Sequence, residues 1–286
     1  MYVPAAQRAL VGSMVRQYRH DAGLDLADTA GFLRCDRSKM SRIESGERGF
    51  SPAELRTVLT GLGVDAAARE LLAAISGWRE APGWWQDFLP VLPGPCLDFA
   101  VPEALAAQAL IYAPLQVPDL LCIPAYAKAL AAGDPGIPRR QEARVVEAMQ
   151  ARRQVVVEER RIRLSVVIGE AALRQQVGEA DVLRQQLSHL AELARSDGQR
   201  ISLRVLPFDA DASAAGGTGG FSVLQFDEIP GMAVMHLSGP NGGQCLFEPS
   251  VTEGYVRLFP SLSLQALTPP LSARKILQMA SLSVEG

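Results

Sequence analysis

Apolar residues in the first quarter of the chain recur at the three- and four-residue spacing of amphipathic helices. Leu10, Met14 and Tyr18 form one such stripe, which predicts a helix over residues 5–22 that ends before Gly23. Two later stripes predict a helix after Ser51 and a helix after Asp65, with inward positions at Leu55, Val58, Leu59, Leu62, Leu71, Leu72 and Ile75. With two short helices between them, the pattern predicts a five-helix, all-α domain over residues 1–78.

Three positions within this domain carry short polar side chains of the kind that cap helices. Asp25 and Asp36 each precede a short helical segment, and Ser51 precedes Pro52 with Glu54 at the third helical position. Oxygen atoms of such side chains accept hydrogen bonds from the free N–H groups of the first turn. We therefore expect Asp25, Asp36 and Ser51 to begin the second, third and fourth helices. Two short helices joined by a tight break form a helix-turn-helix, whose second helix can enter a major groove of DNA.

The third predicted helix separates an inward face from an outward one. Met40 and Ile43 lie three positions apart and should pack into the core, whereas polar and basic residues occupy the other side. Arginine and lysine bind guanine edges or phosphate, and serine can bond to either. We predict that the DNA-binding residues are Arg34, Arg37, Ser38, Lys39, Arg42 and Arg48. The alternative is a solvated, charged face of a small helical bundle.

The remaining two-thirds of the chain mix helical with strand-like patterns. Helices are predicted over residues 102–113, 124–132, 140–153, 179–195, 251–267 and 272–280. Strands are predicted over residues 163–169, 201–206, 220–226 and 232–237. This order favours an α/β domain with a mixed sheet over residues 96–286, so the chain as a whole is α+β. Residues 79–95 have the composition of a linker, in which Trp84 and Trp85 are expected to dock between the domains.

Composition places the chain among ordinary folded proteins, since 48% of its 286 residues are hydrophobic and 21% are charged. The net charge of −3 excludes a wholly basic coat but not a local DNA-binding face. Between Arg34 and Arg48, five basic residues outnumber three acidic ones. The four cysteines have no metal-ligand spacing, so no metal or cofactor is expected. The absence of a long apolar run or signal-peptide pattern predicts a cytoplasmic protein without membrane contact.

Three other features suggest further chemistry, but each has a simpler explanation that fits it better. The glycines of residues 216–220 could cradle a phosphate, but a flexible hairpin or disordered loop fits them better because no Lys-Ser/Thr follows. His236 and Cys245 could act as base and nucleophile, but no orienting acid accompanies them. Eight arginines between residues 139 and 163 could extend a DNA footprint, yet four interleaved glutamates favour a solvated helix face. We therefore expect no enzymatic activity.

The segment from Arg37 to Gly46 resembles the recognition helix of XRE/Cro-type transcriptional regulators. Ser51-Pro52, Trp84-Trp85-Gln86-Asp87 and several later stretches resemble one large actinomycete branch of that family, among them residues 112–121, 126–130, 167–174 and 204–208. In that branch a C-terminal domain of poorly defined function follows the helix-turn-helix, and members are frequently paired with a short companion protein. The chain departs from the family at Leu26, where Gln usually braces a phosphate, at Thr29, where Leu is usual, and at Arg34, where Gly is usual. These departures bear on affinity and on the site that is read.

Pattern and resemblance together predict a transcriptional regulator that binds double-stranded DNA as a homodimer, because paired recognition helices match a palindromic site. The C-terminal domain would provide the dimer contact and control DNA binding through a small-molecule effector or a partner protein. An alternative is an antitoxin-like or interaction module that binds a small companion protein, with DNA binding secondary. A third is that the helices serve protein contact alone. A well-formed apolar pocket would favour the effector, and a flat exposed apolar patch would favour the partner protein.

Overall fold

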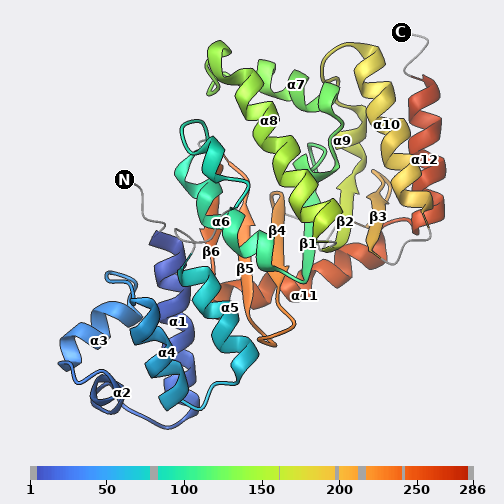
Figure 1. Cartoon of the computed structure of the whole chain (residues 1–286). Helices are drawn as coiled ribbons and strands as arrows, with labels where there is room; N and C mark the ends of the chain where they lie inside the picture. The colour runs from blue at the N-terminus through green and yellow to red at the C-terminus, as the bar shows by residue number, and fades with distance from the viewer. Residues whose placement is uncertain are drawn as a thin grey trace.

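A computed structural model of the chain describes residues 5–77, 83–160, 162–196, 200–211, 217–239 and 242–282. Its N-terminal part is helical and lies at one end of a larger part built around a sheet (Figure 1). Both parts agree with the predicted α+β class, with helices first and a mixed sheet afterwards.

The helical part contains, within the described residues, the five helices that the sequence predicts. They are α1 (Ala5–Asp21), α2 (Leu26–Phe32), α3 (Arg37–Glu44), α4 (Pro52–Gly61) and α5 (Ala66–Ser76). The inward positions of their apolar stripes are buried, including Leu10, Met14, Met40, Ile43, Leu55, Leu59, Leu72 and Ile75. Ala30 of α2 is buried in the same cluster, so apolar side chains from all five helices join them into one packed unit.

The larger part, called the sheet domain below, is organised around one six-stranded sheet among the described residues. Its strands are β1 (Gln108–Ala113), β2 (Arg163–Gly169), β3 (Ile201–Leu206), β4 (Phe221–Gln225), β5 (Ala233–Leu237) and β6 (Gln244–Leu246). Their order is β3-β2-β1-β4-β5-β6; β1, β2 and β3 run parallel, and β4, β5 and β6 continue from β1 as antiparallel neighbours. The sheet is therefore mixed, as predicted.

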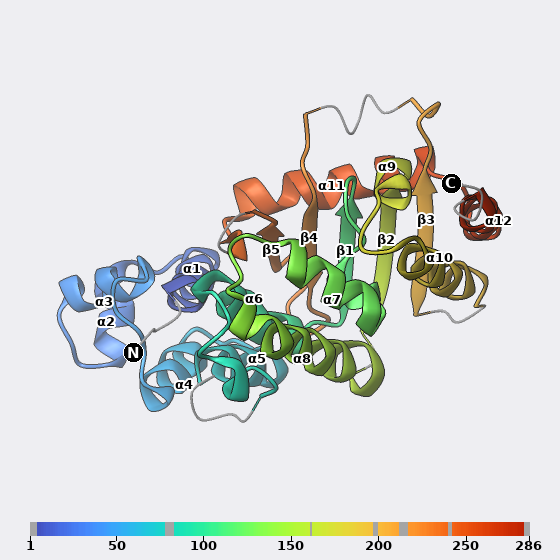
Figure 2. The same cartoon turned by 90° about the horizontal axis from the view of Figure 1, so that it is seen from above.

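Helices cover both faces of this sheet (Figure 2). One face packs against α11 (Pro249–Gln265) through Phe221, Met235, Phe259 and Leu262. On the opposite face lie α6 (Gly94–Leu105), α7 (Pro124–Gly133), α8 (Glu142–Arg153) and α10 (Ala180–Arg195). The short α9 (Glu170–Arg174) follows β2, and α12 (Pro269–Leu282) packs against α10 and β3. A helical segment of π type, Gln154–Glu159, extends α8.

The helical part meets the sheet part through α6, which contacts both α1 and α5. At this junction the Gln7 side-chain amide of α1 lies 3.5 Å from the Leu97 carbonyl oxygen of α6. Helix α1 therefore contacts both α3 and the sheet domain.

The predicted helix over residues 102–113 is wrong. Helix α6 ends at Leu105, despite holding Pro102 within it, and residues Gln108–Ala113 form β1. This strand is central, with β2 on one side and β4 on the other, and four of its six residues are buried. A strand buried on both faces is apolar without interruption, so its pattern resembles that of a buried helix. The predicted strands over residues 163–169 and 201–206 match β2 and β3.

Candidate nucleic-acid interface

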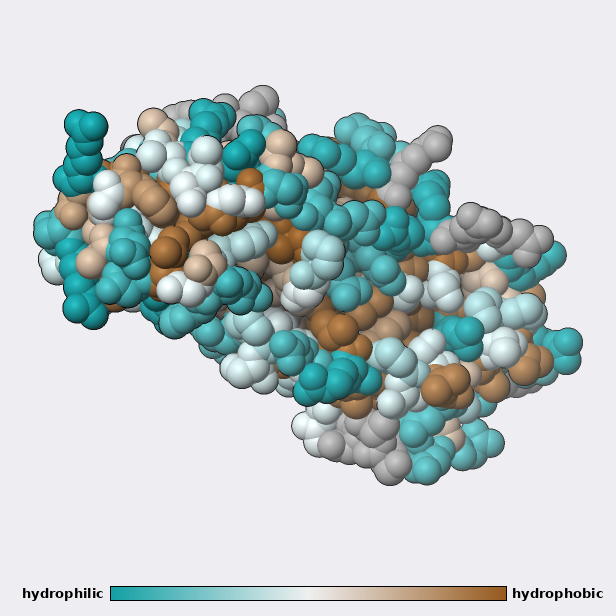
Figure 3. Space-filling model, turned by 90° about the horizontal axis from the view of Figure 1, so that it is seen from below, coloured by the Kyte–Doolittle hydropathy of each residue, from teal (hydrophilic) through white to brown (hydrophobic). Residues whose placement is uncertain are grey.

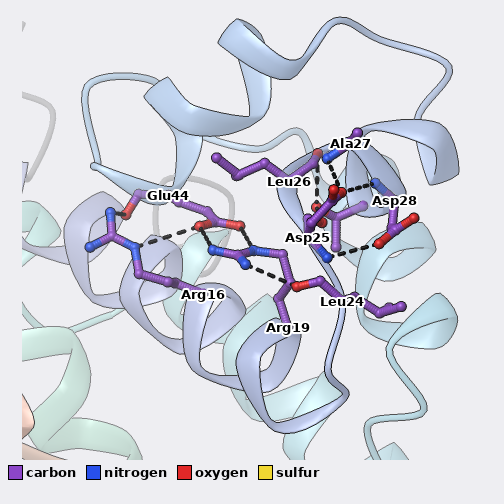
Figure 4. Close-up of polar contacts among 9 residues, drawn as sticks. Arg16, Arg19, Leu24, Asp25, Leu26, Ala27, Asp28 and Glu44 are labelled. Atoms are coloured by element: carbon purple, nitrogen blue, oxygen red, sulfur yellow. Dashed lines mark hydrogen bonds and ion pairs between the residues drawn. The ribbon is translucent and has the colours of Figure 1, made fainter.

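Helix α2 begins with a reciprocal pair of hydrogen bonds between side chain and backbone. The Asp25 carboxylate accepts from the N–H groups of Ala27 and Asp28, at 2.6 and 2.9 Å, and the Asp28 carboxylate accepts from the Asp25 N–H (Figure 4). These bonds lower the pKa of Asp25 below its usual value, chiefly through the backbone N–H of Asp28. Asp25 therefore lies at the cap position that the sequence predicts, and two carboxylates occupy this helix end.

The break between α2 and α3 is a tight, left-handed turn. Arg34 has a φ of 49° and is the only residue other than glycine with positive φ in the described parts of the chain. The N–H groups of Arg34 and Cys35 donate to the carbonyls of Gly31 and Ala30, each at 3.1 Å. This is the Schellman arrangement, which ends a helix and usually places glycine at the left-handed position. Arginine here keeps the turn and adds an exposed cation.

Helix α3 is capped by Asp36 and divided into two faces. The Asp36 carboxylate accepts from the Lys39 N–H and the Ser38 hydroxyl, both at 2.7 Å, and these bonds lower the pKa of Asp36. Met40 and Ile43 are buried in the core, whereas Arg37, Ser38, Ser41 and Arg42 are exposed. Figure 3 shows hydrophilic residues along the outer edge of this unit, at the left, beside more apolar ones. The outward face can therefore offer guanidinium and hydroxyl groups to a duplex.

A buried ion pair fixes the C-terminal end of α3 to α1. Arg19 donates from Nε and Nη2 to the two oxygens of Glu44, each at 2.8 Å, and its Nη1 donates to the Leu24 carbonyl (Figure 4). Arg16 adds a bond from Nη2 to the Glu44 carbonyl at 3.1 Å. Only 8% of the Arg19 side chain and 2% of the Glu44 side chain are exposed. A bidentate, desolvated pair of this kind sets the angle at which α3 leaves the core.

The close approach of α1 and α3 requires a glycine at position 12. A Cβ atom at Gly12 would lie 2.4 Å from the Ile43 carbonyl oxygen, so α1 and α3 approach too closely for any side chain at this position. Sequence reasoning missed Gly12, Arg19 and Glu44 as positioning residues. A signal was present in the spacing of Gly12, Arg16 and Arg19 along one side of α1, but only the fold shows what that side meets.

Helix α4 begins with the predicted capping box and also binds α3. The Ser51 hydroxyl accepts from the Glu54 N–H at 3.3 Å, and the Glu54 carboxylate accepts from the Ser51 N–H at 2.9 Å. The other Glu54 oxygen accepts from Lys39 Nζ at 2.6 Å. These contacts, the Lys39 bond first, lower the pKa of Glu54 to about 2. Lys39 is thus engaged within the domain rather than directed freely outward.

The remaining predicted residues lie around this unit without joining one cluster. Arg34 and Arg48 are exposed on the turns before and after α3, and the Arg48 N–H donates to the Arg42 carbonyl at 3.0 Å. Of the departures from the resembled family, Thr29 is buried, and its hydroxyl donates to the Asp25 and Leu26 carbonyls, both at 3.3 Å. A polar residue is therefore tolerated in the core because its hydroxyl is hydrogen-bonded.

The tryptophan pair is anchored on α6. Trp85 is buried in an apolar cluster with Leu97, Ala100, Val101 and Ala104, and Trp84 packs at its side. Within the described residues, this cluster holds no side chain from the first five helices. The segment after the predicted boundary is thus attached to the sheet domain, and docking between domains by Trp84 and Trp85 stays a prediction.

His236 and Cys245, which suggested a base and a nucleophile, lie opposite each other on the paired strands β5 and β6. His236 Nε2 donates to the Gly242 carbonyl at 2.8 Å, and burial raises the pKa of the Cys245 thiol to about 12, so it stays protonated. Part of the glycine-rich segment, including Gly216, lies outside the described residues. No group of three or more metal-ligating side chains occurs in the parts of the chain that the structure describes. None of the described helices is long and apolar enough to cross a bilayer.

Capped helices with this tight turn and an exposed third helix define a helix-turn-helix protein, and a model described as a helix-turn-helix domain matches residues 10–72. A second family model, described as a domain of unknown function (DUF5753), matches residues 97–278. Because that match spans more than half of the chain, the chain belongs to this family. Neither the search of curated proteins nor that of solved structures found a match.

Proposed function

We propose that this protein is a sequence-specific transcriptional regulator that binds double-stranded DNA through α3. The proposal rests on one observation, which is the way in which both ends of α3 are held in the domain. Asp36 caps its start, Glu44 locks its end to α1, and Arg37 and Arg42 remain exposed on the side away from the core. A rigidly held helix with outward guanidinium groups is suited to reading base edges in a major groove.

We further propose that the sheet domain controls this binding and that the protein is a non-enzymatic, cytoplasmic homodimer. Helix α1 supports control, because it contacts α6 near its start and holds Glu44 of α3 near its end. The residues of α3 are also the basis for proposing an XRE/Cro-type regulator, and Ser51-Pro52 with Trp84-Trp85-Gln86-Asp87 are the basis for proposing its actinomycete branch. A shift of α6 would be passed to α3 through one continuous helix.

The alternative proposal, binding of a small companion protein, is supported by exposed apolar side chains on the sheet domain. Leu115, Phe208 and Leu264 are 65%, 66% and 86% exposed. Exposed apolar side chains of this size can contribute to contact with another protein. A partner that binds there while DNA retention stays at background would favour the alternative.

The test is selection of genomic fragments by the purified full-length protein over a range of salt concentrations, with sequencing of the retained DNA. We expect a small set of fragments with a shared motif to be enriched. The double variant Arg37→Ala/Arg42→Ala should lose this enrichment, because it removes the exposed guanidinium groups of α3 without touching the core.

Arg257→Ala is the matched control, since this α11 arginine is equally charged and its side chain is 72% exposed, far from α3 in the chain. It should retain the wild-type set of fragments. Equal enrichment by the double variant and the wild type would refute DNA reading by α3. Retention of random fragments alone would refute sequence specificity.

A further inference from the structure

Lys39 has an unexpected position for a residue on the recognition helix. Its ammonium group donates to Glu54 Oε1 at 2.6 Å, across the gap between α3 and α4. The Lys39 and Glu54 side chains are 19% and 26% exposed, so the pair is partly shielded from water. The charge of Lys39 is therefore paired within the domain before any duplex approaches.

Glu54 is fixed independently of Lys39. Its second oxygen accepts from the Ser51 N–H at 2.9 Å, as part of the capping box that begins α4. The hydrogen bond from Lys39 and, after it, the one from the Ser51 N–H lower the pKa of Glu54 to about 2, so the low pKa reflects both contacts. A permanently charged, backbone-bound acceptor holds a lysine more firmly than a mobile surface carboxylate does.

The arginines of the same helix are held differently. Arg37 and Arg42 are exposed, and neither forms an ion pair with a carboxylate in the described residues. Arg42 makes one long bond, from Nε to the Ser38 carbonyl at 3.4 Å. Ser41 is also exposed on the outward side. One helix thus carries a restrained lysine beside two available arginines.

We propose that Glu54 is a specificity-determining residue, which holds the Lys39 ammonium against α4 and leaves base reading to Arg37, Ser41 and Arg42. The proposal rests on the proposed DNA-binding function. A lysine free to reach phosphate adds affinity for every sequence, whereas base contacts add affinity for one. Restraining the lysine lowers non-specific binding and raises the ratio of specific to non-specific affinity.

The test uses the full-length variant Glu54→Gln, since glutamine also completes a capping box but carries no charge. Binding is measured on the most enriched fragment from the genomic selection and on a duplex of shuffled sequence, over a salt series. For the shuffled duplex, we expect the slope of log affinity against log salt to steepen by about 0.9, the value for one additional phosphate contact. Affinity for that duplex should rise about threefold, and discrimination between the two duplexes should fall.

Two further variants separate this role from a structural one. Lys39→Gln should keep the wild-type slope, because Lys39 does not touch phosphate when Glu54 holds it. Lys39→Gln/Glu54→Gln should return the steepened slope to the wild-type value, which a loss of helix capping would not do. A slope flattened by Lys39→Gln alone, or unchanged by Glu54→Gln, would overturn the proposal. If wild-type protein instead enriches no fragment, the proposed function fails, and this result is distinct from both.

Discussion

The helix-turn-helix unit and the sheet domain begin their helices in different ways. In the first, α2, α3, α4 and α5 each start at a residue whose side chain accepts from the backbone of the first turn. In the second, α6 to α11 have no such side-chain bond among the described residues, and α6, α7 and α11 carry proline in the first turn instead. Local signals therefore define the first unit, whereas packing on the sheet positions the helices of the second.

The two parts also differ in what their buried charges connect. Glu44 joins two neighbouring helices of one small bundle. In the sheet domain, Glu170 accepts from Lys275 at 2.7 Å and from the Phe208 N–H at 3.2 Å, which joins segments far apart in the sequence. The buried Glu44 thus links two helices of one bundle, whereas the buried Glu170 links α12 with the segment after β3.

The largest effect is expected from Glu44→Gln. This change leaves the buried Arg19 guanidinium without its counter-charge and should lower the free energy of unfolding of the helical unit by about 3–5 kcal/mol. Urea unfolding followed by circular dichroism gives the magnitude, and hydrogen exchange across α1 and α3 shows where it acts.

The control is Arg19→Met/Glu44→Leu, which replaces both charges by apolar side chains and should recover most of the loss. A loss below about 1 kcal/mol for Glu44→Gln would mean that the pair does not hold α3.

The second largest loss of stability is expected at β3, which lies at one edge of the sheet. Ser272 Oγ accepts from the Val205 N–H at 2.9 Å and donates to the Leu267 carbonyl at 3.1 Å, so it satisfies the open edge of β3. Ser272→Ala should cost about 1–3 kcal/mol, because it leaves buried backbone groups without a partner. Exchange of the β3 amides should quicken, with little change in α1 or α3.

Ser281→Ala on the same helix is the matched control, since this exposed serine bonds only to the turn before it. Its effect should stay within about 0.5 kcal/mol. Equal effects of the two serine variants would show that the edge of β3 needs no side-chain partner.

Local signals define the helical unit, whereas packing between distant segments defines the sheet domain. The sequence therefore predicts the two parts to different extents. The caps at Asp25, Asp36 and Ser51 and the inward positions Met40 and Ile43 depend on residues three or four apart, so the pattern reveals them. Strands β2 and β3 are equally visible, because β-branched and apolar residues are concentrated in short runs bounded by polar segments. These features could be predicted with their boundaries.

What the sequence could not supply are the contacts between distant segments. The central position of β1, the Arg19–Glu44 pair and the Lys39–Glu54 pair each join segments that only the fold brings together. The prediction of the site therefore named a helix but ranked its residues equally. The structure separates Lys39, which is held by α4, from Arg37 and Arg42, which are not.

A smaller effect tests the difference in helix starts directly. Ser51→Ala removes the cap of α4 and should cost about 1 kcal/mol in the free energy of unfolding. Glu179→Ala changes the corresponding position of α10, where no side chain caps the helix, and should stay within about 0.5 kcal/mol. Thermal unfolding of both variants in parallel measures the contrast. Equal losses would show that local capping does not distinguish the two parts.

The smallest effect is expected at Arg34, which occupies a left-handed backbone position although it is not a glycine. Elsewhere in the described chain every left-handed residue is glycine, for example Gly178 in the sheet domain, with φ of 67°. Arg34→Gly should relieve strain at the turn and raise stability by up to about 1 kcal/mol, whereas Arg34→Ala keeps the strain and should not. Both variants lose the same exposed cation, so both should flatten the salt dependence of DNA binding equally if Arg34 meets phosphate. Melting temperature and salt slope, measured on the same two proteins, thus separate backbone geometry from charge. If glycine proved no more stable than alanine, the left-handed turn would not account for the glycine that is usual at this position in the family that the helical unit resembles.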